Sequence, residues 1–259
     1  DNKTFNLEQT VNHYDNVWEE WERAIKCRHS GQASILMSSG YDSGLIACTA
    51  NKFYNDIDCY YTYNSHEDNE IINSRKNIHG ITIINLNLDH GEDSLHQDLY
   101  NTTQDNNQLL ENKFMNAGDR EIYTKHMIPK KKRILIGGDG GDDIYSDYGL
   151  RGLRLRKYSR FGGYFPRDLS TVWPWHENNV FENFHGRTEI VGGYHGIEYR
   201  CPFMSNSLIQ AWINTTHELK NKRHKGWMAQ YMDDHSYPYA NLDTLGPTKK
   251  SGAWHQLDG

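Results

Sequence analysis

The sequence lacks the features of a membrane-spanning or disulfide-rich protein. No apolar run approaches the roughly 20 residues that a helix needs to cross a bilayer, and the first residues show no signal-peptide pattern. The four cysteines are widely separated and form no C-x-x-C pair, so neither a zinc site nor a redox-active dithiol is indicated. We therefore expect a cytoplasmic protein that keeps its thiols reduced and has no membrane partner.

The chain also lacks an excess of basic residues. Its 28 Lys and Arg against 34 Asp and Glu give a formal net charge of -6, whereas general binding to nucleic acid depends on a basic field. The short run PKKKR at residues 129–133 precedes an apolar segment, and we interpret it as a solvated turn. A nucleic-acid partner is therefore not expected.

Aromatic residues and alternating apolar segments are abundant instead. Hydrophobic residues amount to 36%, but 17 tyrosines and 7 tryptophans can supply much of the buried surface. Apolar residues spaced by threes and fours from Val11 to Ile25 predict a first helix. Strand-like runs then alternate with helical ones, which is typical of a parallel sheet covered by helices on both faces. The predicted strands are 34–37, 58–63, 81–88 and 132–138, and the helices between them are 43–53, 69–78 and 111–125.

The pattern changes after Leu150. A stretch rich in arginine, glycine and aromatic residues follows, and helices are then predicted over residues 205–219 and 224–235. We therefore expect an α/β core with an N-terminal helix over residues 1–150, and a mostly helical extension over residues 151–259.

The loop SSGYDS at residues 38–43 lies between an apolar strand and a helix. The N–H groups and the dipole at a helix start favour a phosphate. Gly40 permits close approach, and Ser38 and Ser43 add hydroxyl donors. Asp42 would repel a phosphate unless it held a bridging metal ion. The loop is not a Walker loop, because G-x-x-x-x-G-K-[ST] is absent; taken alone, it is equally compatible with an ordinary strand-to-helix turn.

The segment GGDGGDD at residues 137–143 repeats this design after the last predicted strand. Four glycines and three carboxylates leaving one strand end are hard to explain by folding alone. Because ligands of parallel sheets bind beyond the carboxyl ends of the strands, we expect Asp42 and Asp142 to meet at one edge of the sheet. There they could share a hard divalent cation.

These motifs resemble the synthetase domain of the asparagine synthetase superfamily, the PP-loop ATP pyrophosphatases. SSGYDSGLIA resembles the family's S-G-G-x-D-S loop, with Ser39 in place of the first glycine. GGDGGDDIYSDYG resembles S-G-E-G-x-D-E-x-F-G-G-Y, with Asp139 and Asp143 in place of glutamates. GIEYRCPFMS resembles E-x-R-x-P-F-L-D, with Ser205 in place of aspartate; HKGWMAQYM resembles the helix that follows, and GPTKKSGAW resembles the late R-x-K-x-x-F segment without its arginine. The resemblance covers most of the chain and implies a Rossmann-like adenine nucleotide alpha hydrolase fold.

The resemblance implies an ATP-dependent, AMP-forming amide ligase. A substrate carboxylate would attack the α-phosphorus of Mg-ATP, and ammonia or an amine would then displace AMP. Magnesium would be held by Asp42 and Asp142. The residues implied for nucleotide binding are Leu36, Ser38, Ser39, Gly40, Asp42, Ser43, Tyr63 and Gly138. Those implied for catalysis are Lys249, with Lys250 as the alternative, together with Glu198 and Asp139. Glu198 could equally form an ion pair with Arg200, and Lys249 could be a solvated lysine.

The resemblance leaves the partners open. No glutaminase domain precedes the first motif, so we expect nitrogen from free ammonia, from a separate glutaminase subunit, or from an amine on the substrate, as in β-lactam synthetases and lasso-peptide cyclases. The acceptor would be a small-molecule or peptide carboxylate whose site the extension completes. A homo-oligomer also stays open.

Two other functions are open at this point. A tRNA-modifying PP-loop enzyme could use the basic stretch 151–160, although the acidic net charge and the absence of paired cysteines disfavour it. A catalytically inactive nucleotide-binding subunit is the other, and the carboxylates of Asp42, Asp142 and Asp143 count against it.

Overall fold

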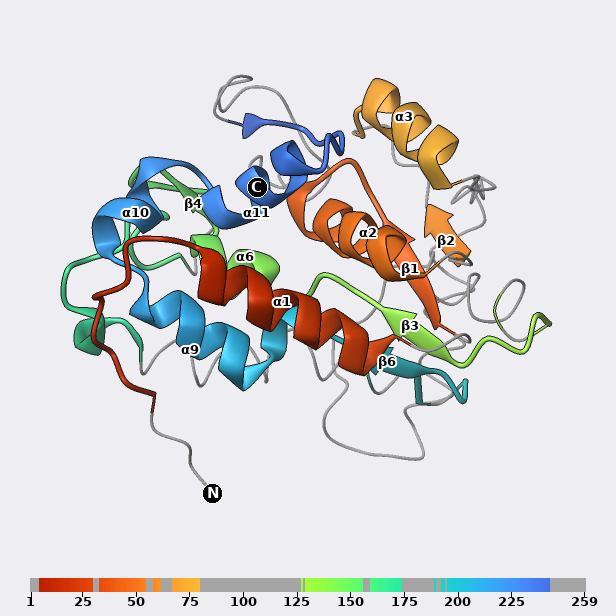
Figure 1. Cartoon of the computed structure of the whole chain (residues 1–259), viewed down its shortest axis with the longest axis horizontal. Helices are drawn as coiled ribbons and strands as arrows, with labels where there is room; N and C mark the ends of the chain where they lie inside the picture. The colour runs from red at the N-terminus through yellow and green to blue at the C-terminus, as the bar shows by residue number, and fades with distance from the viewer. Residues whose placement is uncertain are drawn as a thin grey trace, which may run out of the picture.

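A small parallel sheet organises the chain in the computed structural model, which describes residues 5–29, 33–54, 58–61, 67–79, 127, 129–155, 159–173, 189, 192–193 and 195–242. The four strands run in the order β2-β1-β3-β6 and are all parallel (Figure 1). They are β1 (Ala33–Met37), β2 (Asp58–Tyr61), β3 (Ile134–Ile136) and β6 (Glu198–Arg200). The protein therefore has the α/β architecture with a parallel sheet that the alternation of segments predicts.

The register of the two central strands positions the loops that follow them. β1 pairs with β3 so that Ile35 lies opposite Ile136, and both side chains are completely buried. Because the strands are parallel and in this register, they end at the same edge of the sheet. The predicted strand over 81–88 lies outside the described residues. β6 was not predicted as a strand, although it completes the sheet beside β3.

The helices follow the predicted segments with two corrections, of which the first is that the first helix begins at Asp15 and not at Val11, which pairs with Thr215 in an isolated bridge. They are α1 (Asp15–Arg28), α2 (Tyr41–Phe53), α3 (Asn69–His79), α6 (Gly141–Ser146), α9 (Asn206–Asn214), α10 (His217–Lys222) and α11 (Gly226–Asp234). Two 3-10 turns (Leu169–Thr171 and Pro202–Met204) and a hairpin of β4 (Gly149–Leu150) and β5 (Leu153–Arg154) complete the described elements. The single helix expected over 205–219 is wrong, because Thr216 has extended backbone and caps a new helix through its hydroxyl. The predicted helix over 111–125 is outside the described residues.

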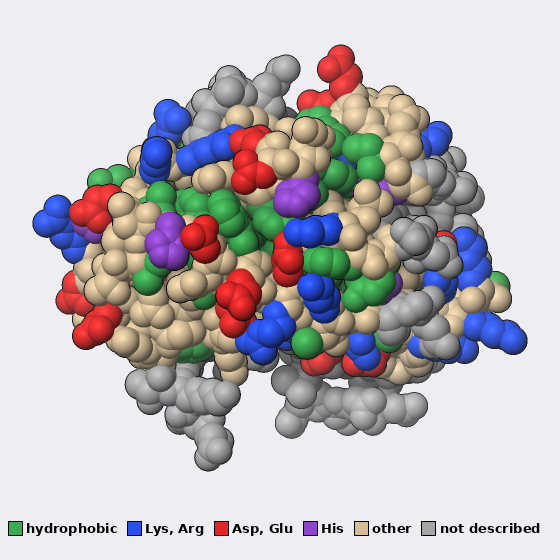
Figure 2. All heavy atoms as spheres, in the orientation of Figure 1, with side chains coloured by type: hydrophobic (Ala, Val, Ile, Leu, Met, Phe, Trp, Pro, Cys, Tyr) green, Lys and Arg blue, Asp and Glu red, His purple; other side chains and the backbone are tan. Residues whose placement is uncertain are grey.

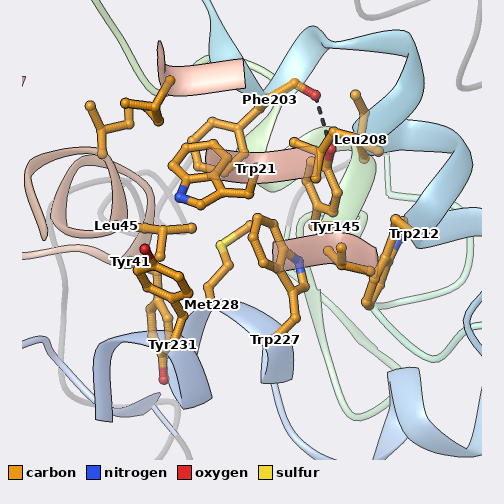
Figure 3. Packing of buried hydrophobic residues seen from close by; sticks show 14 of the residues in the cluster. Trp21, Tyr41, Leu45, Tyr145, Phe203, Leu208, Trp212, Trp227, Met228 and Tyr231 are labelled. Atoms are coloured by element: carbon orange, nitrogen blue, oxygen red, sulfur yellow. Dashed lines mark hydrogen bonds between the residues drawn. The ribbon is translucent and has the colours of Figure 1, made fainter. Parts of the chain in front are cut away.

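Helices from both ends of the chain share one core with the sheet. α1 packs against α2 and α9, and α11 packs against α2 (Figure 1). In the aromatic cluster of Figure 3, the rings of Trp21 and Phe203 stack at 4.6 Å, and those of Tyr145 and Trp227 lie 5.3 Å apart. The hydroxyl of Tyr145 donates to the carbonyl of Phe203 at 2.9 Å. Residues from before and after position 150 therefore contribute to one core, and β6 belongs to the same sheet as β1.

The distribution of charged side chains and the character of the helices agree with the polar composition of the sequence. Acidic and basic side chains both lie on the face shown in Figure 2. Among the described helices, none combines the length and the apolar character that a bilayer span requires.

The last residue of α3 is held against the C-terminal part of the chain. The Nε2 atom of His79 lies 2.7 Å from the hydroxyl of Tyr237, and the two rings are 5.5 Å apart. Burial, together with the nearby Arg75 guanidinium, lowers the pKa of His79 to about 4. This contact fixes the end of α3.

The lowered pKa of His79 makes stability depend on pH. An unfolded histidine titrates near pH 6.5, so the unfolded state binds more protons than the folded state between about pH 6.5 and 4. The contribution of His79 is therefore fully present above pH 6.5 and is lost as pH falls towards 4. His79→Gln should flatten this part of the pH dependence of the unfolding free energy, measured by urea denaturation. The exposed His13→Gln is the control, and an unchanged slope in His79→Gln would contradict the prediction.

Candidate active site

The loop between β1 and α2 is closed by hydrogen bonds among its own small residues. The N–H of Ser38 donates to Oγ of Ser43 at 2.9 Å, and the two hydroxyl oxygens lie 2.8 Å apart. The N–H of Gly40 donates to Oγ of Ser38 at 3.2 Å. Since α2 begins at Tyr41, Asp42 lies in its first turn, at the positive end of the helix dipole. The predicted loop is thus a tight turn opening a helix.

Ser39 is completely buried, and its side chain has a structural use that glycine could not fulfil. Its N–H donates to Oε2 of Glu67 at 2.7 Å, and its hydroxyl donates to the same oxygen. The N–H of Asp68 donates to the Ser39 hydroxyl at 3.2 Å. Ser39 therefore ties the loop after β1 to the segment that precedes α3.

Glycines in the loop between β3 and α6 make room for Asp42. A Cβ atom on Gly141 would lie 2.4 Å from Cγ of Asp42, and one on Gly138 would lie 3.0 Å from its Cβ. Gly140 has φ +87°, a left-handed conformation that residues with a side chain rarely adopt. The glycine-rich motif thus lets the two strand-end loops pack directly against each other, and α6 then places Asp142 in its first turn.

Lys225 joins the two loops. Its Nζ lies 2.6 Å from Oδ1 of Asp42 and 2.6 Å from Oδ1 of Asp142. The lysine side chain is only 3% exposed, and the two carboxylates are 18% and 13% exposed. The expected proximity of Asp42 and Asp142 is observed, and a cation of the chain itself lies between them.

The three groups shift one another's protonation. Burial alone would lower the pKa of Lys225, but the two carboxylates outweigh it, so the pKa is raised above its ordinary value. Burial alone would raise the pKa of Asp142, but Lys225 holds it below the ordinary value. Burial raises the pKa of Asp42 to about 7 despite Lys225, and the charge of Asp142 adds to this. Asp142 therefore stays ionised as the counter-ion of Lys225, whereas the charge of Asp42 depends on pH near neutrality.

Asp139 and Asp143 extend the acidic cluster. The pKa of Asp143 is raised to about 7 by burial and by the charge of Asp142, although the hydroxyl of Tyr148 donates to its carboxylate at 3.1 Å. The charge of Asp139 raises the pKa values of both Asp42 and Asp143. The structure therefore brings Asp139 to the same end of the sheet as Asp42 and Asp142.

Other predicted residues fall into two groups. Leu36 lies in β1, half buried and opposite Tyr60 of β2, and Gly138 lies beside Asp42. Tyr63, Lys249 and Lys250 lie outside the described residues.

Glu198 does not join the acidic cluster. It pairs in the sheet with Ile134, at the amino end of β3, whereas Asp139 and Asp142 follow the carboxyl end. Its carboxylate forms a two-pronged ion pair with Arg200 at 2.8 and 2.9 Å. Of the two interpretations of Glu198, the structure shows the ion pair.

Lys225 was missed from the sequence, although it has a local signal. The positive end of a helix dipole disfavours a lysine, yet Lys225 is the N-cap of α11, directly before Gly226. Its backbone is left-handed, with φ 46° and ψ 43°, and non-glycine residues held in this region cluster at functional sites. A lysine at the start of the apolar helix HKGWMAQYM was therefore a candidate.

The two aspartates supply oxygens of the kind that bind a divalent cation such as magnesium, but the Lys225 ammonium lies 2.6 Å from Oδ1 of each. Mg²⁺ is commonly held by one or two carboxylates, with substrate phosphates and water completing its coordination. Oxygens of this kind converge on the Lys225 ammonium, so the structure accommodates positive charge at this point. Within the described ranges, no group of three His, Cys, Asp or Glu side chains could hold a metal alone. A cation here would therefore depend on a ligand for the rest of its coordination.

The cavities do not by themselves identify the site. One of about 700 Å³ lies at the amino ends of β3 and β6, with Arg133 and Glu198 in its lining. A second, of about 20 Å³, adjoins Lys225 and is bounded by Ser146 and Arg223 among others. We place the site at the strand-end loops instead, because the carboxylates of Asp42 and Asp142 converge on Lys225 there, and neither aspartate lines either cavity.

Comparison with known proteins adds no assignment. No known family model matches the chain, and no curated protein matches it.

The Lys225 ion pairs should be strongly coupled to stability. Lys225→Met leaves two carboxylates in a largely buried place, and removing one partner of such a pair typically costs about 3–5 kcal/mol. The cost should be greater at pH 8 than at pH 5, because without the ammonium the folded state resists ionising carboxylates that ionise freely when unfolded. Urea denaturation at both pH values measures this. Lys222→Met is the exposed control, and a Lys225→Met variant as stable as this control would contradict the prediction.

Proposed function

We propose that the chain is an ATP-dependent amide ligase of the asparagine synthetase-like PP-loop type. It would activate a carboxylate as an acyl-adenylate, release pyrophosphate, and transfer ammonia or an amine to the acyl group. The C-terminal helices would form the extension that completes the acceptor site.

The observation that supports this proposal most is the convergence of two strand-end loops on one buried lysine. Asp42 follows β1 and Asp142 follows β3, and both bind Lys225 at 2.6 Å. A fold needs no such arrangement for stability, because replacing a buried ion pair by apolar residues is often neutral or stabilising. The sequence instead keeps three charges and several glycines at the edge where parallel α/β sheets bind ligands.

Each residue of the cluster has a use in this chemistry. The hydroxyls of Ser38 and Ser43 and the start of α2 would bind the β- and γ-phosphates. Asp42 and Asp142 would hold magnesium, which supplies charge neutralisation on the phosphates. Lys225 adds a fixed positive charge at the same place, so it joins Lys249 and Lys250 as a candidate for stabilising charge on the α-phosphate.

The proposed reaction has two balanced steps. An oxygen of the acceptor carboxylate forms a bond to the α-phosphorus while the bond from that phosphorus to the bridging oxygen breaks, and pyrophosphate leaves. The nitrogen then forms a bond to the acyl carbon while the bond from carbon to the AMP oxygen breaks. The amine loses a proton to a nearby base, a role that the buried Asp143 or the neighbouring Asp139 could fulfil.

Asp142→Asn tests the proposal. Loss of an outer-shell partner of a metal typically costs 10–100-fold in activity, so loss of a direct ligand should lower pyrophosphate release by more than about 100-fold. The measurement is pyrophosphate release from Mg-ATP with a panel of amino acids and ammonium.

The control is Asp234→Asn, an exposed aspartate at the end of α11 that should retain full activity. The circular dichroism spectrum should be unchanged in both variants. Turnover that survives Asp142→Asn would disprove the metal assignment. Absence of any Mg-ATP-dependent thermal shift in the unmodified chain would disprove every nucleotide-dependent function.

A further inference from the structure

Arg75 is a completely buried arginine on α3 that binds the backbone of the loop after β1. It lies on α3 and is 0% exposed. Its guanidinium donates to three backbone carbonyls: to that of Ser38, to that of Gly40 at 3.0 Å, and to that of Pro238 at 2.9 Å. Two of these three acceptors belong to the loop proposed to bind phosphate.

The guanidinium occupies a space that the sequence keeps free. A Cβ atom on Gly44 would lie 2.1 Å from Nη2 of Arg75. Gly44 is in the first two turns of α2, where glycine costs about 1 kcal/mol relative to alanine. The guanidinium carbon also lies 5.3 Å from the centre of the Tyr237 ring. The guanidinium is therefore closely packed against α2 at Gly44.

The charge of Arg75 is only partly compensated by the protein. Within the described part of the chain, Arg75 forms hydrogen bonds to carbonyls and no ion pair. The acid whose charge acts on it, Glu67, accepts hydrogen bonds from Ser39 of the same loop. A buried charge is costly unless an opposite charge is near. An anion bound on the outer side of the loop would supply that opposite charge.

We propose that Arg75 is a positioning residue for the phosphates of the substrate. By binding the carbonyls of Ser38 and Gly40, it fixes the orientation of the peptide groups in the loop. It also places a positive charge next to these carbonyls. This inference rests on the proposed function, because it assigns a further residue to the same phosphate site.

The test compares binding of Mg-pyrophosphate to folded variants by isothermal titration calorimetry. Arg75→Lys keeps the charge but loses the planar fork that reaches separate carbonyls. Since hydrogen bonds to charged groups contribute more free energy than those between neutral groups, losing those that orient the loop should raise the Kd for Mg-pyrophosphate about tenfold or more. Arg200→Lys is the matched control, because Arg200 also donates to a backbone carbonyl, that of Arg28 at 2.7 Å, but that carbonyl belongs to α1 and not to the loop after β1.

A second variant leaves Arg75 itself unchanged. Gly44→Ala places a methyl group where the guanidinium lies, while alanine favours the helix. Alone it should weaken binding of Mg-pyrophosphate. In the double variant with Arg75→Lys, Gly44→Ala should raise the Kd by a smaller factor than it does alone, because the shorter lysine leaves room for the methyl group.

The outcomes separate this inference from the proposed function. If the unmodified chain does not bind Mg-pyrophosphate, the proposed function is disproved and this inference with it. If the unmodified chain binds but folded Arg75→Lys binds equally well, or Arg200→Lys is weakened as much, only the inference is disproved. If Arg75→Lys does not fold, unchanged binding by Gly44→Ala disproves it, and weakened binding supports it. A merely structural role would lower the melting temperature and leave the Kd of the folded protein unchanged.

Discussion

The arrangement at the carboxyl edge of the sheet depends on one buried ammonium group between two carboxylates. Lys225 compensates Asp42 and Asp142, and without it two negative charges would face each other in a largely water-free place. The ion pairs also join three segments far apart in the sequence: the start of α2, the start of α6 and the start of α11. Each segment contributes the end of a helix, so small changes in the position of one helix act directly on the cluster.

A second set of contacts holds the same edge from the side of α3. Glu67 accepts hydrogen bonds from the N–H and hydroxyl of Ser39, and Arg75 donates to the carbonyls of Ser38 and Gly40. Acidic and basic side chains from one segment therefore bind complementary backbone groups of one loop. The conformation of this loop therefore depends on contacts with the segment around α3 as well as on its own sequence, and the hydroxyl of Ser39 takes part in those contacts.

Much of the fold could be predicted, because buried parallel strands and amphipathic helices have local patterns. The strands around Ile35 and Ile136 are continuous apolar runs, and both are found. β6 was missed because it has three residues, of which only Tyr199 is buried, so no period can be recognised. The break at Thr216 was missed because the apolar spacing continues across it, and only the capping geometry separates α9 from α10.

The aspartates of the site could be predicted from their place after strands, whereas the buried Arg75 could not. Asp42 stands in a loop with three serines and a glycine, and Asp142 stands in a glycine-rich loop; both compositions are unusual for a folded turn. Arg75 stands in the polar helix NEIINSRKNIH and looks like a solvated residue. Its burial results from the segment at Pro238, which is 163 residues away. Contacts of such long range leave no pattern in a single sequence.

The packing of α1 against segments after residue 200 has a consequence for how the chain is made. α1 lies near the amino end, yet its partners Phe203 and Trp227 are about 180 to 200 residues further along. During synthesis the ribosome adds about 5–20 residues per second, so the apolar face of α1 stays without its final neighbours for on the order of ten seconds or more. A nascent chain of this kind exposes Trp21 to water or to a chaperone until the last helices emerge, and its folding is governed by long-range closure rather than by local order.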